Sequence, residues 1–265
     1  MNNRILLVVG DKFASYVQGK DAITLSQLKG LLGLPIQILP TQGRTVLVPG
    51  QGMSEESIKS LLEAAAKSVN LRYFDFSLWQ NLPKRAPSSL SHKHLTQNTL
   101  ISAPKQLSED HFELHILIDE NCDLMSDHQT GQHVQGMILV EAVRQSSMAI
   151  TQTFFLPKND IDYAFVLNDM SVKYNNFTFP VAASIVCHIS AKNIDNPRRL
   201  NFFMDAEVYQ CGTSVSSLKF SITAMDKLRI SKQESMQASK THKNYLAQIE
   251  REIECLELSA IANHH

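Results

Sequence analysis

The sequence predicts an α+β protein in which a small α/β unit precedes a domain made of one buried helix and an antiparallel sheet. Three observations predict this class. Short apolar strands alternate with helices over residues 1–78, which favours a partly parallel sheet. A helix is expected at 133–153, and residues 137–143 leave it hardly any polar face over two turns, so it must be buried. Four strand-like stretches with turn residues between them follow, as in an antiparallel meander.

The first 78 residues are expected to fold as a small α/β domain. The elements expected in it are strands at 5–9, 45–48 and 71–76 and helices at 24–32 and 54–69. Ser54 is the expected N-cap of the second helix. The loop at 49–52 joins a strand to this helix, as phosphate-binding loops do. It lacks the third glycine of a dinucleotide fingerprint and the Lys-Ser/Thr of a P-loop, which favours a plain turn.

Residues 79–93 combine prolines, serines and basic side chains without periodicity, which is typical of a linker. The second domain is expected at 94–228. Its expected strands lie at 112–118, 163–174, 183–191, 200–209 and 214–224. The C-terminal helix is expected at 229–265, with the apolar stripe Leu246, Ile249, Ile253 and Leu256. This stripe suits packing on the domain or on a second subunit, with a partner-binding coiled coil as the alternative.

Composition excludes several classes of protein. The chain has 25 Lys+Arg against 26 Asp+Glu, so there is no overall basic field for nucleic acid. No apolar run reaches the roughly 18 residues of a membrane helix, and the N-terminal run is too short for a signal peptide. The four cysteines form no CxxC pair, which predicts free thiols, no structural zinc and a reducing, cytoplasmic compartment. No cofactor motif is present, and no cofactor is expected.

Glu141 is the anomaly of the predicted buried helix. Burying a carboxylate costs several kcal/mol unless it is paired or protonated. Arg144 lies one helical turn further on and could pair with Glu141 as a structural element. Alternatively, Glu141 lines a substrate cleft with a shifted pKa and serves as an acid, a base or an anchor. The two interpretations are compatible.

The segment before this helix carries Asp127, His128 and His133. A helix N-terminus offers free N–H groups, here near Gly136 and Met137, that can hold a carbonyl oxygen as it gains negative charge. A thioester carbonyl would suit such a site. Asp127 could orient an imidazole or simply begin a turn. A metal site made of these three side chains is not expected, because no further ligand has helical spacing.

Residues 127–145, DHQTGQHVQGMILVEAVRQ, resemble the signature of the hotdog-fold A-factor biosynthesis (AfsA) family, D-H-x-x-x-H-V-P-G-M-x-x-x-E-A-x-R-Q. They are also similar to the corresponding stretch of the hotdog β-hydroxyacyl-ACP dehydratases. The resemblance covers about residues 92–228 and implies a hotdog domain, a long central helix wrapped by an antiparallel sheet. It does not extend to the first 80 residues or to the C-terminal tail.

The resemblance implies chemistry on acyl thioesters, carried by acyl carrier protein (ACP) or coenzyme A. AfsA enzymes join a β-ketoacyl group to dihydroxyacetone phosphate, and the dehydratases use a histidine and a glutamate contributed across a pair of hotdog units. The residues carried over as catalytic are His128, His133 and Glu141. Those expected to bind substrate are Gly136, Met137, Asp127, Arg144 and Gln145. The resemblance also implies a homodimer formed through the hotdog domain.

This chain departs from the family pattern in two ways. Gln135 replaces the proline before the glycine, and the chain carries one hotdog unit where AfsA proteins carry two. Three functions stay open: acyl transfer or dehydration, a hotdog module that binds an acyl chain or a partner without turnover, and a scaffold in which Glu141 and Arg144 form a structural pair. Five basic residues are expected to be plain surface or, alternatively, to contact a phosphate or a carrier protein: Lys84, Arg85, Lys93, Arg198 and Arg199.

Overall fold

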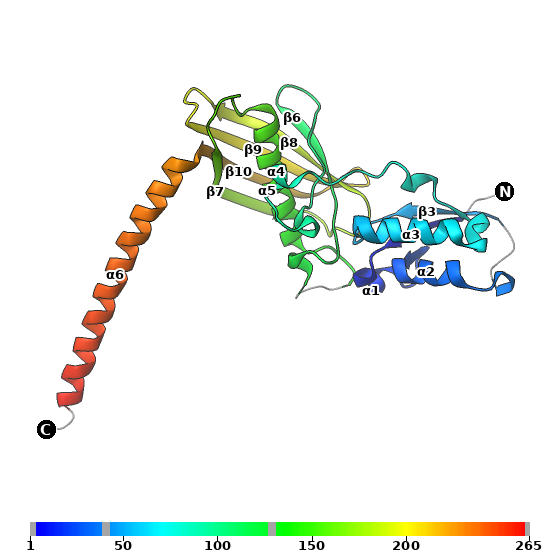
Figure 1. Ribbon diagram of the computed structural model, residues 1–265, viewed down its shortest axis with the longest axis horizontal. Helices are drawn as coiled ribbons and strands as arrows, with labels where there is room; N and C mark the ends of the chain where they lie inside the picture. The colour runs from blue at the N-terminus through cyan, green and yellow to red at the C-terminus, as the bar shows by residue number, and fades with distance from the viewer. Residues whose placement is uncertain (1–3, 39–42, 127–130, 263–265) are drawn as a thin grey trace. The chain divides into compact units, whose positions relative to one another are not determined.

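The computed structural model describes residues 4–38, 43–126 and 131–262 and contains two sheets (Figure 1). The first sheet has the order β2-β1-β3-β4, and the second has the order β5-β6-β8-β9-β10-β7. The strands of the first sheet are β1 (Arg4–Val9), β2 (Ala22–Thr24), β3 (Thr45–Pro49) and β4 (Phe74–Asp75). The strands of the second are β5 (Lys105–Gln106), β6 (His111–Ile116), β7 (Tyr163–Tyr174), β8 (Ala183–Asn193), β9 (Arg199–Gln210) and β10 (Thr213–Asp226). The α-helices are α1 (Ala14–Val17), α2 (Leu25–Gly33), α3 (Glu55–Lys67), α4 (Ser88–Ser91), α5 (Gly136–Phe154) and α6 (Lys227–Ala262).

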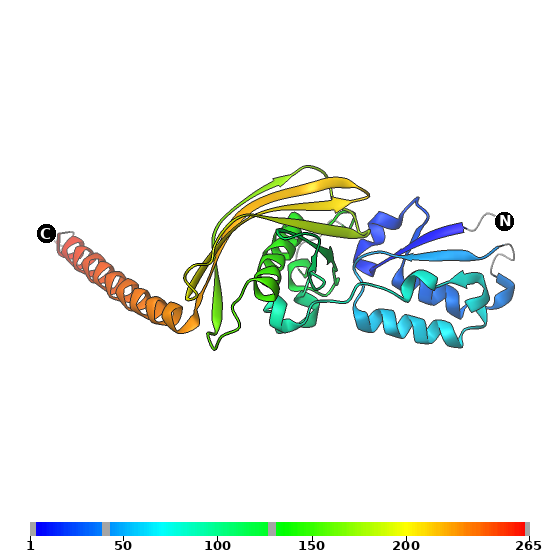
Figure 2. The same ribbon diagram turned by 90° about the horizontal axis from the view of Figure 1, so that it is seen from above.

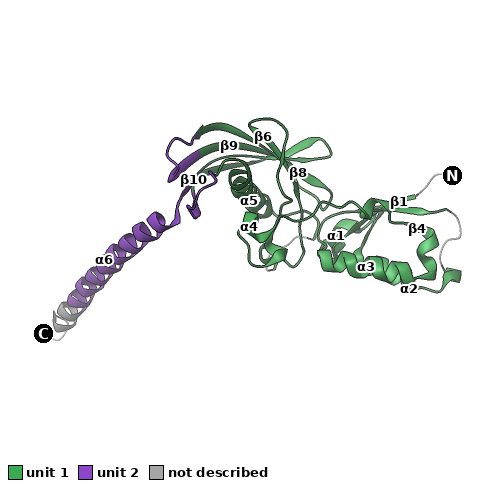
Figure 3. Cartoon of the chain, turned by 45° about the horizontal axis from the view of Figure 1, so that its top comes forward, with its two compact units in different colours: residues 1–156, 167–192, 202–222 green, residues 157–166, 193–201, 223–265 purple. Residues whose placement is uncertain are grey.

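The chain divides into two compact units (Figure 3). The first comprises residues 1–156, 167–192 and 202–222, and it holds the four-stranded sheet, α5 and most of the six-stranded sheet. The second comprises residues 157–166, 193–201 and 223–265 and holds α6. The site and the cavity described below lie within the first unit.

The four-stranded sheet is parallel throughout, as the alternation of strands and helices predicts. Helices α2 and α3 lie on one of its faces (Figure 2), and Leu6, Val8 and Leu47 point into the core on that side. The opposite face of the sheet is less covered, since the Ile5 side chain of β1 is 62% exposed. Ser54 caps α3 as predicted, its hydroxyl accepting the N–H of Ser57.

The strand predicted at 71–76 is largely wrong. Only Phe74 and Asp75 are in a strand, and residues 69–73 form a 3-10 helix. Buried Asn70 explains the difference, because its side-chain amide donates to the carbonyls of Leu31 and Leu34 at the C-terminal end of α2. These side-chain bonds hold the segment as a turn against the preference of its alternating pattern.

Helix α5 is largely buried, and the six-stranded sheet curves over it (Figure 2). Strand β6 pairs antiparallel with both β5 and β8. Strands β7 to β10 lie where the sequence predicts them, so the predicted α+β class is confirmed. The helix begins at Gly136 and not at residue 133, because the N–H of Val134 donates to the carbonyl of Thr178 in a β-bridge.

The segment 79–93 packs against the rest of the first unit at several points. Trp79, Ala86 and Ser91 are buried, and the Ser91 hydroxyl lies 2.9 Å from that of Thr99. Helix α6 carries its apolar stripe exposed at Leu246, Ile253 and Leu256, and no packing partner covers these three side chains within the part of the chain that is described. None of the described helices is long and apolar enough to cross a membrane.

Candidate functional site at the N-terminus of helix α5

The N-terminus of α5 presents unused backbone donors. The first N–H groups of a helix have no partner inside the helix. Within the described ranges, the N–H groups of Gly136 and Met137 donate no hydrogen bond, whereas that of Ile138 donates to Gln135 O. The Met137 side chain is 58% exposed, so this end of the otherwise buried helix is open to solvent. The arrangement can hold one carbonyl oxygen that gains negative charge.

Gly136 packs closely against a neighbouring aromatic ring. A Cβ atom at this position would lie 2.6 Å from Cζ of Tyr174. Tyr174 ends β7 and its side chain is half exposed, so the ring forms one wall beside the first turn of α5. The glycine thus allows an aromatic ring to lie directly against the helix N-terminus.

Glu141 lies five residues after Gly136, about 7.5 Å further along the helix axis. Its carboxylate accepts hydrogen bonds from Arg144 on both oxygens at 2.7 Å, which confirms the predicted pairing with Arg144. Two further donors complete the cluster: Lys93 Nζ at 2.7 Å and Gln145 Nε2 at 3.0 Å. The Glu141 side chain is 18% exposed. This partly buried anion therefore has four contacts to positive or polar donors.

The charge state of Glu141 follows from these contacts. Burial raises its pKa, but the hydrogen bonds from Arg144, Lys93 and Gln145 outweigh burial and lower the pKa to about 2. The hydrogen bonds that Arg144 donates to Glu141 raise the pKa of Arg144. Glu141 is thus a carboxylate at neutral pH. Of the roles considered for it from the sequence, that of an anchor fits this environment and that of a proton donor does not.

Gln145 is buried, and its carboxamide ties α5 to the neighbouring segment. Its Oε1 accepts the N–H of Leu100 at 2.9 Å, and its Nε2 donates to the carbonyl of Asn98 at 2.8 Å. Gln145 was expected to bind substrate, but its carboxamide already forms hydrogen bonds with these backbone groups and with Glu141. In this position it fixes the helix that carries the carboxylate.

Of the predicted residues His133, His128 and Asp127, only His133 lies among the described residues. His133 is partly exposed, and its ring lies 5.0 Å from that of Phe177. Asp127 and His128 lie outside the described residues, so their catalytic and substrate-binding roles stay predictions. Among the described residues, no group of three or more His, Cys, Asp or Glu side chains could hold a metal ion.

Sequence reasoning missed Lys93 as a partner of Glu141. Lys93 was expected to lie on the surface of a linker. Its contact with Glu141 was not expected because the two residues are 48 positions apart and no local spacing connects them. Arg144 was found because it lies at i+3 on the same helix. Arg198, by contrast, is exposed as expected, and it pairs with Asp226 at 3.5 Å.

A long buried helix wrapped by a curved antiparallel sheet defines a hotdog-fold protein. Residues 75–226 match the family described as the A-factor biosynthesis hotdog domain (AfsA). Because the match covers more than half of the chain, the chain belongs to this family, as its resemblance predicts.

Several solved structures are similar to this chain. A mutant thioesterase from Pseudomonas aeruginosa has 14% identity and a TM-score of 0.39, covering 56% of this chain and 99% of that chain. The dehydratase heterocomplex from Xenorhabdus doucetiae has 15% identity and a TM-score of 0.44, covering 57% and 98%. A hypothetical thioesterase protein with coenzyme A from Streptococcus pneumoniae has 14% identity and a TM-score of 0.35, covering 46% and 87%. No curated protein matches the chain.

Proposed function

We propose that this protein binds acyl thioesters at the N-terminus of α5 and transfers their acyl group to an acceptor hydroxyl, as in A-factor biosynthesis. One observation carries the proposal: Gly136 and Met137 present unused N–H groups at the solvent-open end of a buried helix, in a domain of the AfsA family. The acyl donor is an acyl-ACP or an acyl-CoA, and the acceptor is dihydroxyacetone phosphate.

The proposed reaction is a single acyl transfer. The thioester carbonyl oxygen accepts hydrogen bonds from the N–H groups of Gly136 and Met137, which stabilise the negative charge of the tetrahedral intermediate. The acceptor oxygen forms a bond to the carbonyl carbon as its proton passes to a histidine, His133 or His128. The C–S bond then breaks, and the thiolate leaves and takes the proton back from the imidazolium.

In this proposal Glu141 is a fixed anion that positions the first turns of α5. A dehydratase needs a group that can give a proton to the leaving hydroxyl, and a carboxylate with a pKa of about 2 is unprotonated at neutral pH. The environment of Glu141 therefore favours acyl transfer over dehydration.

A homodimer through the hotdog domain is part of the proposal. Strand β7 lies at one edge of the six-stranded sheet and exposes apolar side chains at Leu167 and Val172. An exposed apolar edge strand is a ready template for pairing with a second copy. We expect the molar mass from light scattering to be that of two chains and Val172→Lys to shift it toward one chain. A wild-type mass of one chain would contradict the dimer.

A second candidate function is a hotdog module that holds an acyl chain without turnover. The saturation of both Glu141 oxygens by Arg144, Lys93 and Gln145 favours it, because such a carboxylate has little capacity left for a substrate. This alternative predicts acyl binding that survives substitution of His133.

The experiment that separates these functions is intact-mass spectrometry of acyl-ACPs incubated with the protein, with and without dihydroxyacetone phosphate. Loss of the acyl mass that requires the acceptor supports transfer, and His133→Gln and His128→Gln then identify the base. Loss of one water from a β-hydroxyacyl-ACP indicates dehydration. An unchanged mass, with the acyl-ACP retained on the protein, favours the binding module.

A further inference from the structure

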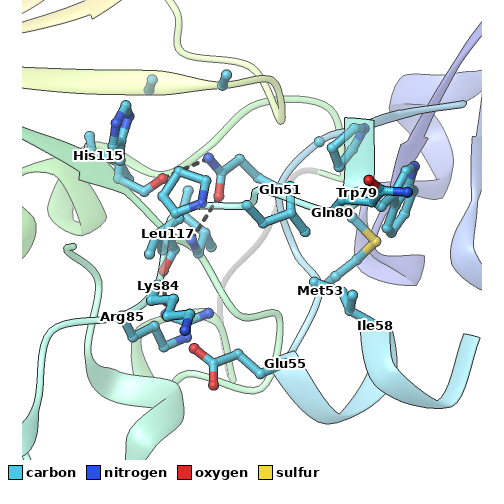
Figure 4. A pocket seen from close by; sticks show the side chains of 18 residues that line it. Gln51, Met53, Glu55, Ile58, Trp79, Gln80, Lys84, Arg85, His115 and Leu117 are labelled. Atoms are coloured by element: carbon cyan, nitrogen blue, oxygen red, sulfur yellow. Dashed lines mark hydrogen bonds between the residues drawn. The ribbon is translucent and has the colours of Figure 1, made fainter. Parts of the chain in front are cut away.

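A cavity of about 700 Å³ lies within the first unit, between the β3–α3 turn and the end of β6 (Figure 4). Its lining comes from the β3–α3 turn and the first turns of α3, from residues 79–85, from residues 115–118 and from the start of β8. No residue of α5 lines it, so it is distinct from the site of Gly136 and Glu141. The volume is within the range of small-molecule sites.

Three N–H groups of the β3–α3 turn already have acceptors within the protein. The N–H groups of Gly50, Gln51 and Gly52 donate to the carbonyls of Val8, Pro180 and Ile118, respectively. The predicted plain turn is consistent with this, because a phosphate would need those N–H groups free. The Gln51 side chain bonds on both sides as well, to Ile116 O at 2.8 Å and to the N–H of Ile118 at 2.7 Å.

Two cations stand together in the cavity wall. Arg85 is partly buried, and its Nη1 donates to the carbonyls of Thr99 and Leu117. Burial lowers the pKa of Arg85, although the charges of Asp119 and Glu55 act in the opposite direction. Lys84 is its exposed neighbour. Over the described part of the chain neither cation forms a salt bridge with a carboxylate, although the Arg85 guanidinium is partly desolvated.

The opposite wall is apolar. Met53, Ile58 and Trp79 lie on the side of the cavity that faces the two cations (Figure 4). Trp79 is nearly fully buried, and its indole N–H donates to Leu47 O at 2.9 Å, so the ring presents no unpaired polar group to a ligand. Glu55 points its carboxylate toward Arg85 from the first turn of α3 (Figure 4).

We propose that this cavity binds an amphipathic organic oxyanion, with its carboxylate or phosphate on Arg85 and Lys84 and its apolar body along Met53, Ile58 and Trp79. A buried guanidinium suits an oxyanion because it can donate two parallel hydrogen bonds to it. Glu55 opposes the ligand charge and sets a limit on affinity. This second site does not depend on acyl transfer at α5.

The chain contains a single tryptophan, Trp79, and it lines the cavity, so tryptophan fluorescence of the full chain reports on this site. The probes are octanoate and octyl phosphate, with octanol and octylamine as the neutral and cationic controls. We expect at least one of the two anions to change the tryptophan emission in a saturable way. The anion with the lower Kd identifies the headgroup, carboxylate or phosphate, that the site prefers. Octanol is expected to bind at least tenfold more weakly, and octylamine not to saturate.

Charge variants test the placement of the headgroup. Arg85→Gln is expected to weaken anion binding by about tenfold or more, and Lys84→Gln, at an exposed position, by about threefold. Glu55→Gln removes the opposing charge and is expected to tighten binding by about threefold. Lys59→Gln, exposed on α3 and outside the cavity, is the matched control and should leave the affinity unchanged.

Two results would overturn the proposal. The first is that neither anion gives a saturable change in emission. The second is that Lys84→Gln and Glu55→Gln bind the anions with the same affinity as the wild type. These two exposed positions decide the outcome even if Arg85→Gln fails to fold. Glu141→Gln separates the two sites, because it is expected to leave the affinity for octanoate and octyl phosphate unchanged whether or not it affects acyl transfer.

Discussion

Glycines lie near the starts of two helices in this protein, in the turn before α3 and at the first residue of α5, and their N–H groups are used differently. The turn before α3 donates the N–H groups of Gly50, Gln51 and Gly52 to carbonyls elsewhere in the first unit. The N–H groups of Gly136 and Met137, the first two residues of α5, have no acceptor among the described residues. An N–H group near a helix start can bind a ligand only where it has no acceptor in the protein, and local sequence does not reveal which N–H groups have one.

The largest expected effect concerns the charge cluster behind the open turn. Glu141→Leu leaves Lys93 and Arg144 partly buried without their anion and should lower the free energy of unfolding by about 3 kcal/mol. Replacing Arg144 as well, in Glu141→Leu/Arg144→Leu, should recover part of this loss. Urea denaturation measures both, with Glu63→Leu on the exposed face of α3 as the control. Equal stability of Glu141→Leu and the wild type would show that the cluster does not support α5.

The next effect compares the two helix starts directly. Met137→Pro removes one unused N–H at the second position of α5, where proline is tolerated. It should lower kcat/KM for acyl transfer by about a hundredfold with little loss of stability. Glu56→Pro, at the same position of α3, is the matched control and should leave kcat/KM unchanged. A similar loss in both variants would contradict the assignment of the donor to α5.

Alanine substitution compares how tightly Gly50 and Gly136 are packed against their neighbours. At Gly50 the added Cβ would meet the carbonyl oxygen of Pro180 at 2.5 Å, so Gly50→Ala should cost about 2 kcal/mol of stability. At Gly136 the Cβ would meet the half-exposed ring of Tyr174, which can turn aside, so Gly136→Ala should cost less. Thermal unfolding measures both, and a larger cost at Gly136 would reverse the comparison.

The smallest effect is the pH dependence of stability that Glu141 carries. Its folded-state pKa is lowered from 4.5 to about 2, so the stabilisation is fully present above about pH 5 and is lost as the pH falls toward 2. Because the group is partly exposed, screening reduces the contribution to about 1–2 kcal/mol. Denaturation at about pH 6 and pH 3 should show a larger loss in the wild type than in Glu141→Gln. The same loss in both would assign the pH dependence to other groups.

Most helices and strands could be predicted because local periodicity and caps determine them. The four strands after α5 and the cap at Ser54 follow from local side-chain patterns. The strand predicted at 71–76 failed because buried Asn70 bonds to the end of α2, a contact that alternation cannot express. Local patterns predict an element until a distant polar partner competes for its backbone.

The candidate site could be predicted only where it lies on one helix. Gly136, Glu141 and Arg144 belong to α5, and their spacing gives both the open N-terminus and the ion pair. Lys93 reaches Glu141, and Arg85 lines the cavity, through contacts across long stretches of chain. Such contacts depend on how the segments pack, which the sequence of either segment alone does not specify.

The central claim is that the N–H groups of Gly136 and Met137 hold the acyl carbonyl oxygen. The most direct measurement is the amide chemical shift of both residues when octanoyl-CoA is added, compared with S-octyl-CoA, which lacks the carbonyl. We expect downfield shifts of both amides with octanoyl-CoA only, and none for Gly50, Gln51 and Gly52, whose N–H groups already have acceptors. Unchanged amides at Gly136 and Met137 with octanoyl-CoA bound, or equal shifts with both ligands, would contradict the claim.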